Sequence, residues 1–188
     1  MRRTLPFIAV AVIGAASIAP AVVATQASEP TLAKKMGLKP GQWRTVLRVT
    51  DAEITARPGE SVPADAEPAL RKLIGSTTET YECIGWQQPA GSALTLPGIK
   101  IDAACTFEEL VADGRTLKIK GRCGSPSEGF HADMKVQAEH DDVEMTASVE
   151  TIAFSEGVGL GTTVVATTTS SHVGPCPAGG PEARKNIN

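Results

Sequence analysis

The amino-acid sequence predicts a mainly β fold, an antiparallel meander that forms a curved sheet or a partly closed barrel. Three consecutive segments, 115–123, 130–139 and 143–149, alternate apolar and polar residues with the period of two that a half-buried strand requires. Short turns join them, because Asp113-Gly114 is a two-residue hairpin signal and His140-Asp141-Asp142 is rich in turn-forming residues. Since one face of each segment is polar, we expect the sheet to pack on one side and to meet water on the other.

The first half of the chain adds two strands and one short helix. Residues 43–50 alternate and follow a turn, so they predict a strand. Asp65 is a helix cap and Gly75 a helix stop, and the residues between them place apolar side chains near one face. Residues 78–84 predict a second strand. A long connection rich in Gly, Pro and Ala then spans 85–104.

The second half contains two interruptions of the pattern. The alternation slips near Glu109, as a β-bulge would cause. Near Thr151 the inward positions shift to Ile152 and Phe154. The last strand is predicted over 162–173, which is rich in Thr and Val and therefore has high β propensity.

Residues 1–27 have the pattern of a secretory signal peptide. A positive start at Arg2 and Arg3 precedes an apolar run, and small residues favour cleavage after Ala27, with Ala24 as the alternative. The run is nearly long enough to be an uncleaved membrane anchor, but its prolines and its cleavage site favour removal. We therefore expect a periplasmic or secreted protein with no membrane span in the mature chain.

Three parts are predicted after the signal peptide: a flexible leader at 28–38, the β domain at 39–176 and a disordered tail at 177–188. The full chain carries a net charge of −3. Cleavage removes Arg2 and Arg3, which leaves 16 basic against 21 acidic residues and a net charge of −5. An acidic chain without basic clusters lacks the footprint of a nucleic-acid binder. Nucleic acid is therefore excluded as a partner.

Four cysteines, Cys83, Cys105, Cys123 and Cys176, predict a disulfide framework in an exported protein. Cys83 and Cys105 flank the long connection, and Cys176 lies just beyond the last strand. Among the three pairings that four cysteines allow, these positions favour Cys83–Cys105 and Cys123–Cys176. A four-cysteine zinc site is the rival interpretation, but the chain has no Cys-x-x-Cys motif.

Several short motifs occur in a distinctive order along the chain. They are Lys39-Pro40-Gly41-Gln42-Trp43, Tyr81-Glu82-Cys83-Ile84, Leu96-Pro97-Gly98 before Cys105-Thr106, Gly121-Arg122-Cys123, and Val173-Gly174-Pro175-Cys176. Their order resembles the bacterial family known as domain of unknown function 3617 (DUF3617), over about Lys39 to Cys176. The resemblance implies an exported cell-envelope protein with disulfides and contributes no catalytic residues. The chain departs from lipidated members of the family because no cysteine lies near either cleavage site.

No residue set in the sequence has the spacing of a catalytic, cofactor or metal site, so we expect no cofactor and favour a protein that is not an enzyme. His140-Asp141-Asp142 with Glu144 has some character of a metal site, but a solvated turn is the favoured interpretation. Trp43 and Trp86 are candidates to line an apolar pocket, although Trp43 lies in strand phase, which is typical of a core residue.

Two classes of function follow from these observations. The first is a non-catalytic envelope protein that binds a small apolar ligand or a partner protein of the cell envelope, with 85–104 as a lid or contact loop. The second is a hydrolase or metal-dependent enzyme whose residues assemble from distant strands. The first class is favoured because catalytic motifs are missing.

Overall fold

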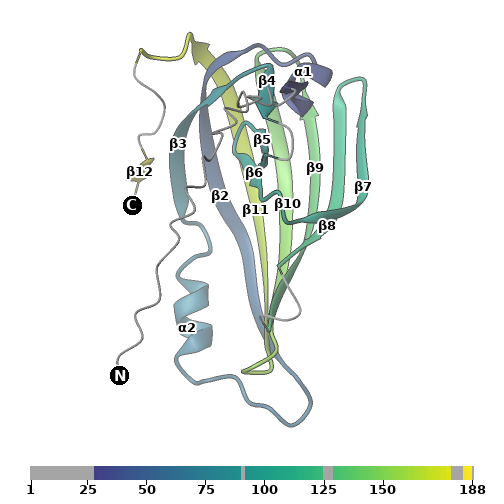
Figure 1. The fold of residues 1–188 in the computed structure, drawn as a ribbon. Coiled ribbons are helices and arrows are strands. Elements are labelled where there is room, and N and C mark those ends of the chain that lie inside the picture. Colours follow the sequence, from purple (N-terminus) through teal and green to yellow (C-terminus); the bar gives the residue numbers. More distant parts are fainter. Residues whose placement is uncertain (1–27, 90–91, 125–128, 179–183, 188) are drawn as a thin grey trace, which may run out of the picture.

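One curved antiparallel sheet dominates the computed structural model, which describes residues 28–89, 92–124, 129–178 and 184–187. The strand order is β12-β3-β2-β11-β10-β9-β8-β7, with β12 and β7 as the two edges (Figure 1). The strands are β2 (Gly41–Ala56), β3 (Thr77–Ile84), β7 (Thr106–Asp113), β8 (Thr116–Cys123), β9 (Phe130–His140), β10 (Glu144–Ser155), β11 (Leu160–Gly174) and β12 (Arg184–Ile187). The predicted mainly β fold is confirmed, as an open sheet and not a closed barrel.

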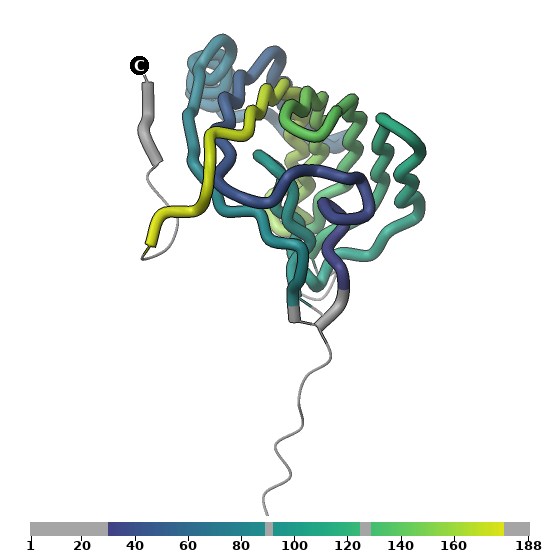
Figure 2. The backbone as a smooth tube through the Cα atoms, turned by 90° about the horizontal axis from the view of Figure 1, so that it is seen from above, coloured from purple at the N-terminus to yellow at the C-terminus, as the bar shows by residue number. Residues whose placement is uncertain are grey.

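Two chain segments lie inside the curve of the sheet, where Figure 2 shows them surrounded by the arc of strands. They comprise the described residues of 28–38 and 85–104, and we call them the cover. The cover contains β1 (Ser28–Pro30) paired with β4 (Gln87–Pro89), the hairpin of β5 (Leu94–Leu96) and β6 (Ile99–Ile101), and helix α1 (Leu32–Lys35). A second short helix, α2 (Ala66–Arg71), precedes β3. Within the described ranges, no helix is both long and apolar enough to span a bilayer.

The hydrophobic core lies between the cover and the upper half of the concave face. Every second residue of the covered strands is buried there, as the alternation predicts. The cover supplies its own apolar side chains, so the long connection is a packed part of the core. The buried members are Ala33, Met36, Leu38, Trp43, Ile84, Leu96, Ile99, Ile101, Cys105, Leu117, Ile119, Val136, Ala138, Met145 and Ala147.

The predicted flexible leader at 28–38 is wrong. Ser28–Pro30 pairs with β4, and the Thr31 hydroxyl caps α1 by accepting a hydrogen bond from the Lys34 N–H at 3.2 Å. Ala33 and Leu38 are fully buried. A segment this short shows no periodicity in the sequence, because tertiary packing and not local pattern holds it in place.

The disulfide pairing differs from the one that the sequence favoured. Cys83 pairs with Cys176, with Cα atoms 5.7 Å apart, and Cys105 pairs with Cys123, with Cα atoms 4.2 Å apart. The β7–β8 register explains the second bond, since Thr106 lies opposite Arg122 and the two cysteines follow next along the hairpin. Cys83–Cys176 thus links β3 to the segment after β11, and Cys105–Cys123 links the end of the long connection to β8.

The predicted β-bulge near Glu109 is confirmed as a register shift between Phe107 and Glu109. The predicted change of phase near Thr151 is wrong, because β10 keeps one register with both neighbours along its whole length. Ile152 and Phe154 therefore lie on the convex face, opposite to the core. An apolar residue at the end of a long strand need not face the core.

Two further boundaries differ from the sequence prediction. The β7–β8 turn is formed by Gly114 and Arg115, so β7 extends through Asp113 and the turn lies one residue later than expected. The tail at 177–188 was predicted to be disordered, yet its residues Arg184–Ile187 form β12 against β3. The predicted signal peptide at 1–27 lies outside the described residues.

Candidate functional site

An apolar strip on the concave face, below the cover, is the candidate functional site, and we call it the trough. The lower halves of β2, β11, β10 and β9 form it where these strands continue beyond the cover (Figure 1). Each of its side chains is partly buried, and none is fully buried as the core residues beneath the cover are. The trough residues are Val49, Ala52, Ile54, Ala132, Met134, Val149, Thr151, Ala153, Thr162 and Val164.

The register of the sheet assigns these residues to one face. Directly paired residues share a face, and every second residue along a strand returns to it. On β10 the buried core residue Ala147 is followed, in steps of two, by Val149, Thr151 and Ala153. The partners of these three on β9 and β11 are also trough or core residues. The trough is thus the continuation of the core along the same strands.

A β-bulge in β2 keeps charge out of the trough. Val49 pairs with Ala166, but the next pair joins Asp51 to Val165, so Thr50 is the extra residue. Without this bulge, strict alternation from Val49 would turn Asp51 toward the concave side. With it, Asp51 lies on the convex face beside exposed residues. Sequence reasoning missed this bulge, because the predicted strand ended at Thr50.

No trough residue is ionisable, and its chemistry is that of an apolar contact surface with two threonine hydroxyls. Met134 and Val149 pack directly against the buried core, so the strip is continuous with it. Two side chains at the lower rim, Arg57 and Glu156, form an ion pair with each other. Chemically, the trough offers an apolar contact surface whose hydrogen-bonding side chains are the hydroxyls of Thr151 and Thr162.

A hollow of about 290 Å³ lies at the upper end of the trough, between the sheet and the β5–β6 hairpin. Leu47, which precedes Val49 on the same face of β2, belongs to its wall. Thr45, Thr78 and Thr80 contribute hydroxyl-bearing side chains from β2 and β3. Lys100, on β6, is exposed and supplies the one cation of this wall. The hollow extends the apolar strip toward a polar rim.

Buried hydrogen bonds hold the cover on the sheet above this hollow. The Gly98 N–H donates to Glu82 Oε1 at 3.1 Å, and the Ser170 hydroxyl donates to the Pro97 carbonyl at 3.3 Å. Ser170 also shares a hydrogen bond of 2.8 Å with the Thr45 hydroxyl. Gly98 has a φ of +71° and lies against Thr45, so a side chain there has no room.

The two tryptophans that were candidate lining residues have different environments. Trp43 is fully buried, donates its indole N–H to the Lys39 carbonyl at 2.9 Å and packs edge-on against His172. Trp86 lies in the cover, is 47% exposed and donates to the Leu38 carbonyl at 3.1 Å. Trp43 is therefore a core residue beneath the cover, in agreement with its strand phase.

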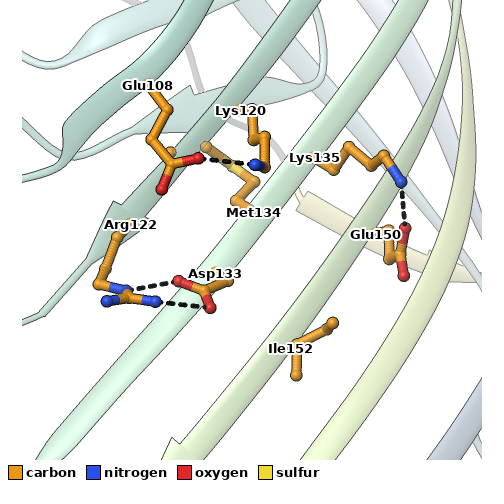
Figure 3. Close-up of a pocket in the computed structure, with 9 residues that line it drawn as sticks. Glu108, Lys120, Arg122, Asp133, Met134, Lys135, Glu150 and Ile152 are labelled. Carbon is orange, nitrogen blue, oxygen red and sulfur yellow. Dashed lines mark hydrogen bonds and ion pairs between the residues drawn. The ribbon is translucent and has the colours of Figure 1, made fainter.

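A second hollow, of about 300 Å³, lies on the convex face and is lined by three ion pairs (Figure 3). Arg122 donates two hydrogen bonds to Asp133, at 2.6 and 3.0 Å, and these lower the pKa of the Asp133 carboxyl. Lys120–Glu108 (2.7 Å) and Lys135–Glu150 (3.4 Å) complete the set. Because each charge has an opposite partner and the side chains are exposed, we interpret the set as cross-strand stabilisation of the sheet.

The His140-Asp141-Asp142 turn has the geometry of a structural turn. Asp141 Oδ1 accepts hydrogen bonds from the N–H groups of Val143 (2.8 Å) and Glu144 (2.7 Å), which lower the pKa of the Asp141 carboxyl. His140 is buried on the concave side, whereas His131 packs against Phe154 on the convex side. In the described parts of the chain, no three His, Cys, Asp or Glu residues are placed to hold a metal ion.

Comparison with known proteins assigns residues 38–176 to a family model described as "Protein of unknown function (DUF3617)". The matched range contains all four cysteines, the trough and most of the cover. No curated protein and no solved structure matches the chain.

Proposed function

This chain belongs to the DUF3617 family, and we propose that it is an exported, non-catalytic periplasmic protein that binds a small apolar ligand in the trough. The observation that carries the proposal is the trough itself. Its side chains are apolar or Thr, they continue the core, and the cover stops above them. An uncharged concave strip of this kind is typical of a binding site for an apolar molecule.

The export part of the proposal rests on the sequence and on the cysteines. Residues 1–27 have the signal-peptide pattern described above, and all four cysteines are in disulfides. Disulfides persist in oxidising compartments, of which the bacterial periplasm is one. The enzyme alternative has no observation in its favour within the described residues, because no metal-binding group of side chains occurs there and the ionisable groups avoid the trough.

Two adjacent valines of β11 provide a matched test of the ligand site. Val164 points into the trough, and Val165 points to the convex face beside it, with both side chains partly buried. Val164→Gln places an amide in the apolar strip, and Val165→Gln makes the same chemical change on the opposite face. We expect Val164→Gln to weaken binding of the neutral probe N-phenyl-1-naphthylamine about tenfold, since losing one buried apolar side chain costs roughly 1.5 kcal/mol.

The measurement is a fluorescence titration of the folded, oxidised protein and of both variants. Val165→Gln should bind the probe as the natural protein does. Equal weakening by both substitutions, or no binding to the natural protein, would contradict the proposal. Native mass spectrometry of protein purified from the periplasm provides an independent check, because a bound lipid-like molecule should be retained and should be lost in Val164→Gln.

A further inference from the structure

The two edges of the sheet differ in what covers them. The β3 edge is paired with β12, the last strand of the chain. At the other edge, β7 pairs with β8 on one side, and on its second side it has no strand partner among the described residues. All eight residues of Thr106–Asp113 are exposed. An edge strand of this kind presents a row of backbone groups to any incoming strand.

The hairpin turn identifies which backbone groups are available. Gly114 and Arg115 form a two-residue turn, so Asp113 and Thr116 are the closing pair, which is hydrogen-bonded in such hairpins. Hydrogen-bonded and non-hydrogen-bonded pairs then alternate along an antiparallel ladder. The N–H and C=O groups of Ala112 and Leu110 consequently point away from β8, toward the open side.

The edge strand β7 is long and has no Lys or Pro. Natural edge strands are protected by charged side chains, above all Lys, by Pro or by being very short, whereas β7 has eight residues and its only charges are the carboxylates of Glu108, Glu109 and Asp113. Its large apolar side chains are 38% exposed at Phe107, 43% at Leu110 and 48% at Val111. Its single bulge lies at the beginning of the strand, next to Phe107. The stretch from Glu109 to Asp113 is regular and open.

The charge of this stretch selects among possible occupants. Glu109 and Asp113 flank Val111 on the convex face, and neither belongs to an ion pair recorded for the described residues, whereas Glu108 is paired with Lys120. Antiparallel pairing with a second copy of β7, centred on Val111, would place Glu109 of each copy opposite Asp113 of the other, which is destabilising. A strand with cations at the corresponding positions would instead form two favourable cross-strand pairs.

We propose that the β7 edge binds an extended segment of a partner protein in which cationic side chains alternate with apolar ones. Its cations lie opposite Glu109 and Asp113, its apolar residues lie opposite Leu110 and Ala112, and its backbone pairs with the open side of β7. Strand addition of this type derives affinity from main-chain hydrogen bonds and specificity from alternate side chains. The neighbouring β8 has the same chemistry, since Lys118 and Lys120 alternate with Leu117 and Ile119. This inference does not depend on the trough.

The test uses two fluorescent peptides, Ser-Lys-Val-Thr-Val-Lys-Ser and its counterpart with Glu in place of each Lys, in a binding titration with the full folded protein. The cationic peptide should bind about tenfold more tightly than the acidic one, since both cross-strand charge pairs are attractive with the cationic peptide and repulsive with the acidic one. The double variant Glu109→Lys with Asp113→Lys should reverse the preference. Ala112→Pro, which removes an N–H on the open side, should abolish binding of both peptides.

A control with the same change of net charge separates the edge from general electrostatics. Glu53 and Glu139 are exposed on the convex face, on β2 and β9, so Glu53→Lys with Glu139→Lys should leave the preference for the cationic peptide unchanged. The proposal is overturned if this control reverses the preference as well, or if both peptides bind the natural protein equally. It is also overturned if the protein sediments as a dimer that Ala112→Pro converts to a monomer, since a second copy would then be the occupant.

Discussion

The covered and uncovered halves of the sheet are built from the same strands and show the same alternation, yet their burial differs. On β10, Met145 and Ala147 lie beneath the cover and are 1% and 2% exposed. Thr151 and Ala153 occupy the same face farther along the strand and are only partly buried. Alternation therefore determines which face a residue joins, and the cover determines whether that face is a core or an open surface.

The convex side shows a related contrast. Over the covered half, the convex face of β9, β10 and β11 carries polar side chains, as a solvated face should. Beside the trough it carries Ile152, which is 45% exposed, and Phe154, which lies under the guanidinium of Arg57 at 4.3 Å from the ring centre. The uncovered half thus has apolar residues on both faces, and that is why sequence periodicity alone suggested a change of phase there.

The largest expected effect concerns the two disulfides, whose cysteines Cys83 and Cys105 flank the long connection at 85–104. Removing Cys83–Cys176 with two Cys→Ser substitutions should destabilise the protein more than removing Cys105–Cys123. The sequence separations are 93 and 18 residues, which correspond to about 4.6 and about 3 kcal/mol of loop entropy. Urea unfolding of the two double variants measures the difference. If removing Cys105–Cys123 costs more stability than removing Cys83–Cys176, the disulfide at the β7–β8 end is the more important of the two.

A smaller effect is expected from truncating one apolar side chain in each half. Leu117→Ala, in the covered half, should cost about 3 kcal/mol, because Leu117 is 1% exposed and its removal leaves a cavity. Ile54→Ala, in the trough, should cost about 1 kcal/mol, since solvent already reaches the Ile54 side chain. Both values come from equilibrium unfolding in urea. Similar costs would indicate that the trough is packed in solution by something that the described residues do not include.

The contact between cover and sheet can be probed at a glycine. Gly98→Ala should cost about 1–3 kcal/mol more than Gly37→Ala, because a methyl group at Gly98 would collide with Thr45. Gly37 has a nearly identical φ, +75°, and nothing lies within 4 Å of the added carbon, so it isolates the backbone penalty. Thermal unfolding compares the two variants. If their Tm values fall equally, the cover yields at Gly98 and is less rigidly packed than its burial indicates.

The smallest expected effect concerns acid. Asp141 is in the turn at the covered end, and Asp133 is on the convex face. Both folded-state pKa values are lowered, by the Val143 and Glu144 N–H groups and by the Arg122 guanidinium respectively. Their contribution to stability is therefore present above the ordinary carboxyl pKa of about 4 and is lost as the pH falls below it.

The variants Asp141→Asn and Asp133→Asn test whether the turn or the convex face contributes more to the acid sensitivity of the folded protein. Asp141→Asn keeps an acceptor oxygen but no longer titrates, so unfolding should depend less on pH below about 4 than in the natural protein. The Asp133 contribution should shrink in 0.5 M salt, because that ion pair is exposed. The measurement is the free energy of unfolding between pH 2 and 5, with and without salt. If both variants show the same pH dependence as the natural protein, other carboxylates dominate the sensitivity to acid.

The consecutive strands from β7 to β11 and their hairpins could be predicted from the sequence, because period-two alternation and turn residues are local signals. The pairing of β2 with β11 and of β12 with β3 was not predicted, because it joins segments that lie far apart along the chain. The pairing of Cys105 with Cys123 was within reach, since the two cysteines lie at matching positions on the two arms of the predicted hairpin. The structure of residues 28–38 could not be predicted, because burial of Ala33 and Leu38 and pairing with β4, which are contacts with distant parts of the chain, hold that segment.

The sequence predicted the general class of the candidate site but not the residues that form it. A small apolar ligand on a curved sheet was expected, but the lining residues were not found. The bulge near Thr50 that keeps Asp51 out of the trough becomes visible only when β2 is aligned with β11. One usable signal was overlooked: the inward positions of 143–149 continue without a charge through Thr151 and Ala153.

The unbroken register of β10 and β11 has a consequence for recognition. A binding surface usually loses conformational freedom when it receives its ligand, and that loss weakens affinity. Here the strands that carry Val149, Thr151 and Val164 are the same ones that are clamped by the core a few residues away. The shape of the trough is therefore fixed by the core against which Met134 and Val149 pack, and by Cys123, which pairs with Ala132 across the β8–β9 ladder. Substitutions beneath the cover should accordingly loosen this preorganised surface, and under the proposed function they should weaken probe binding without touching the trough.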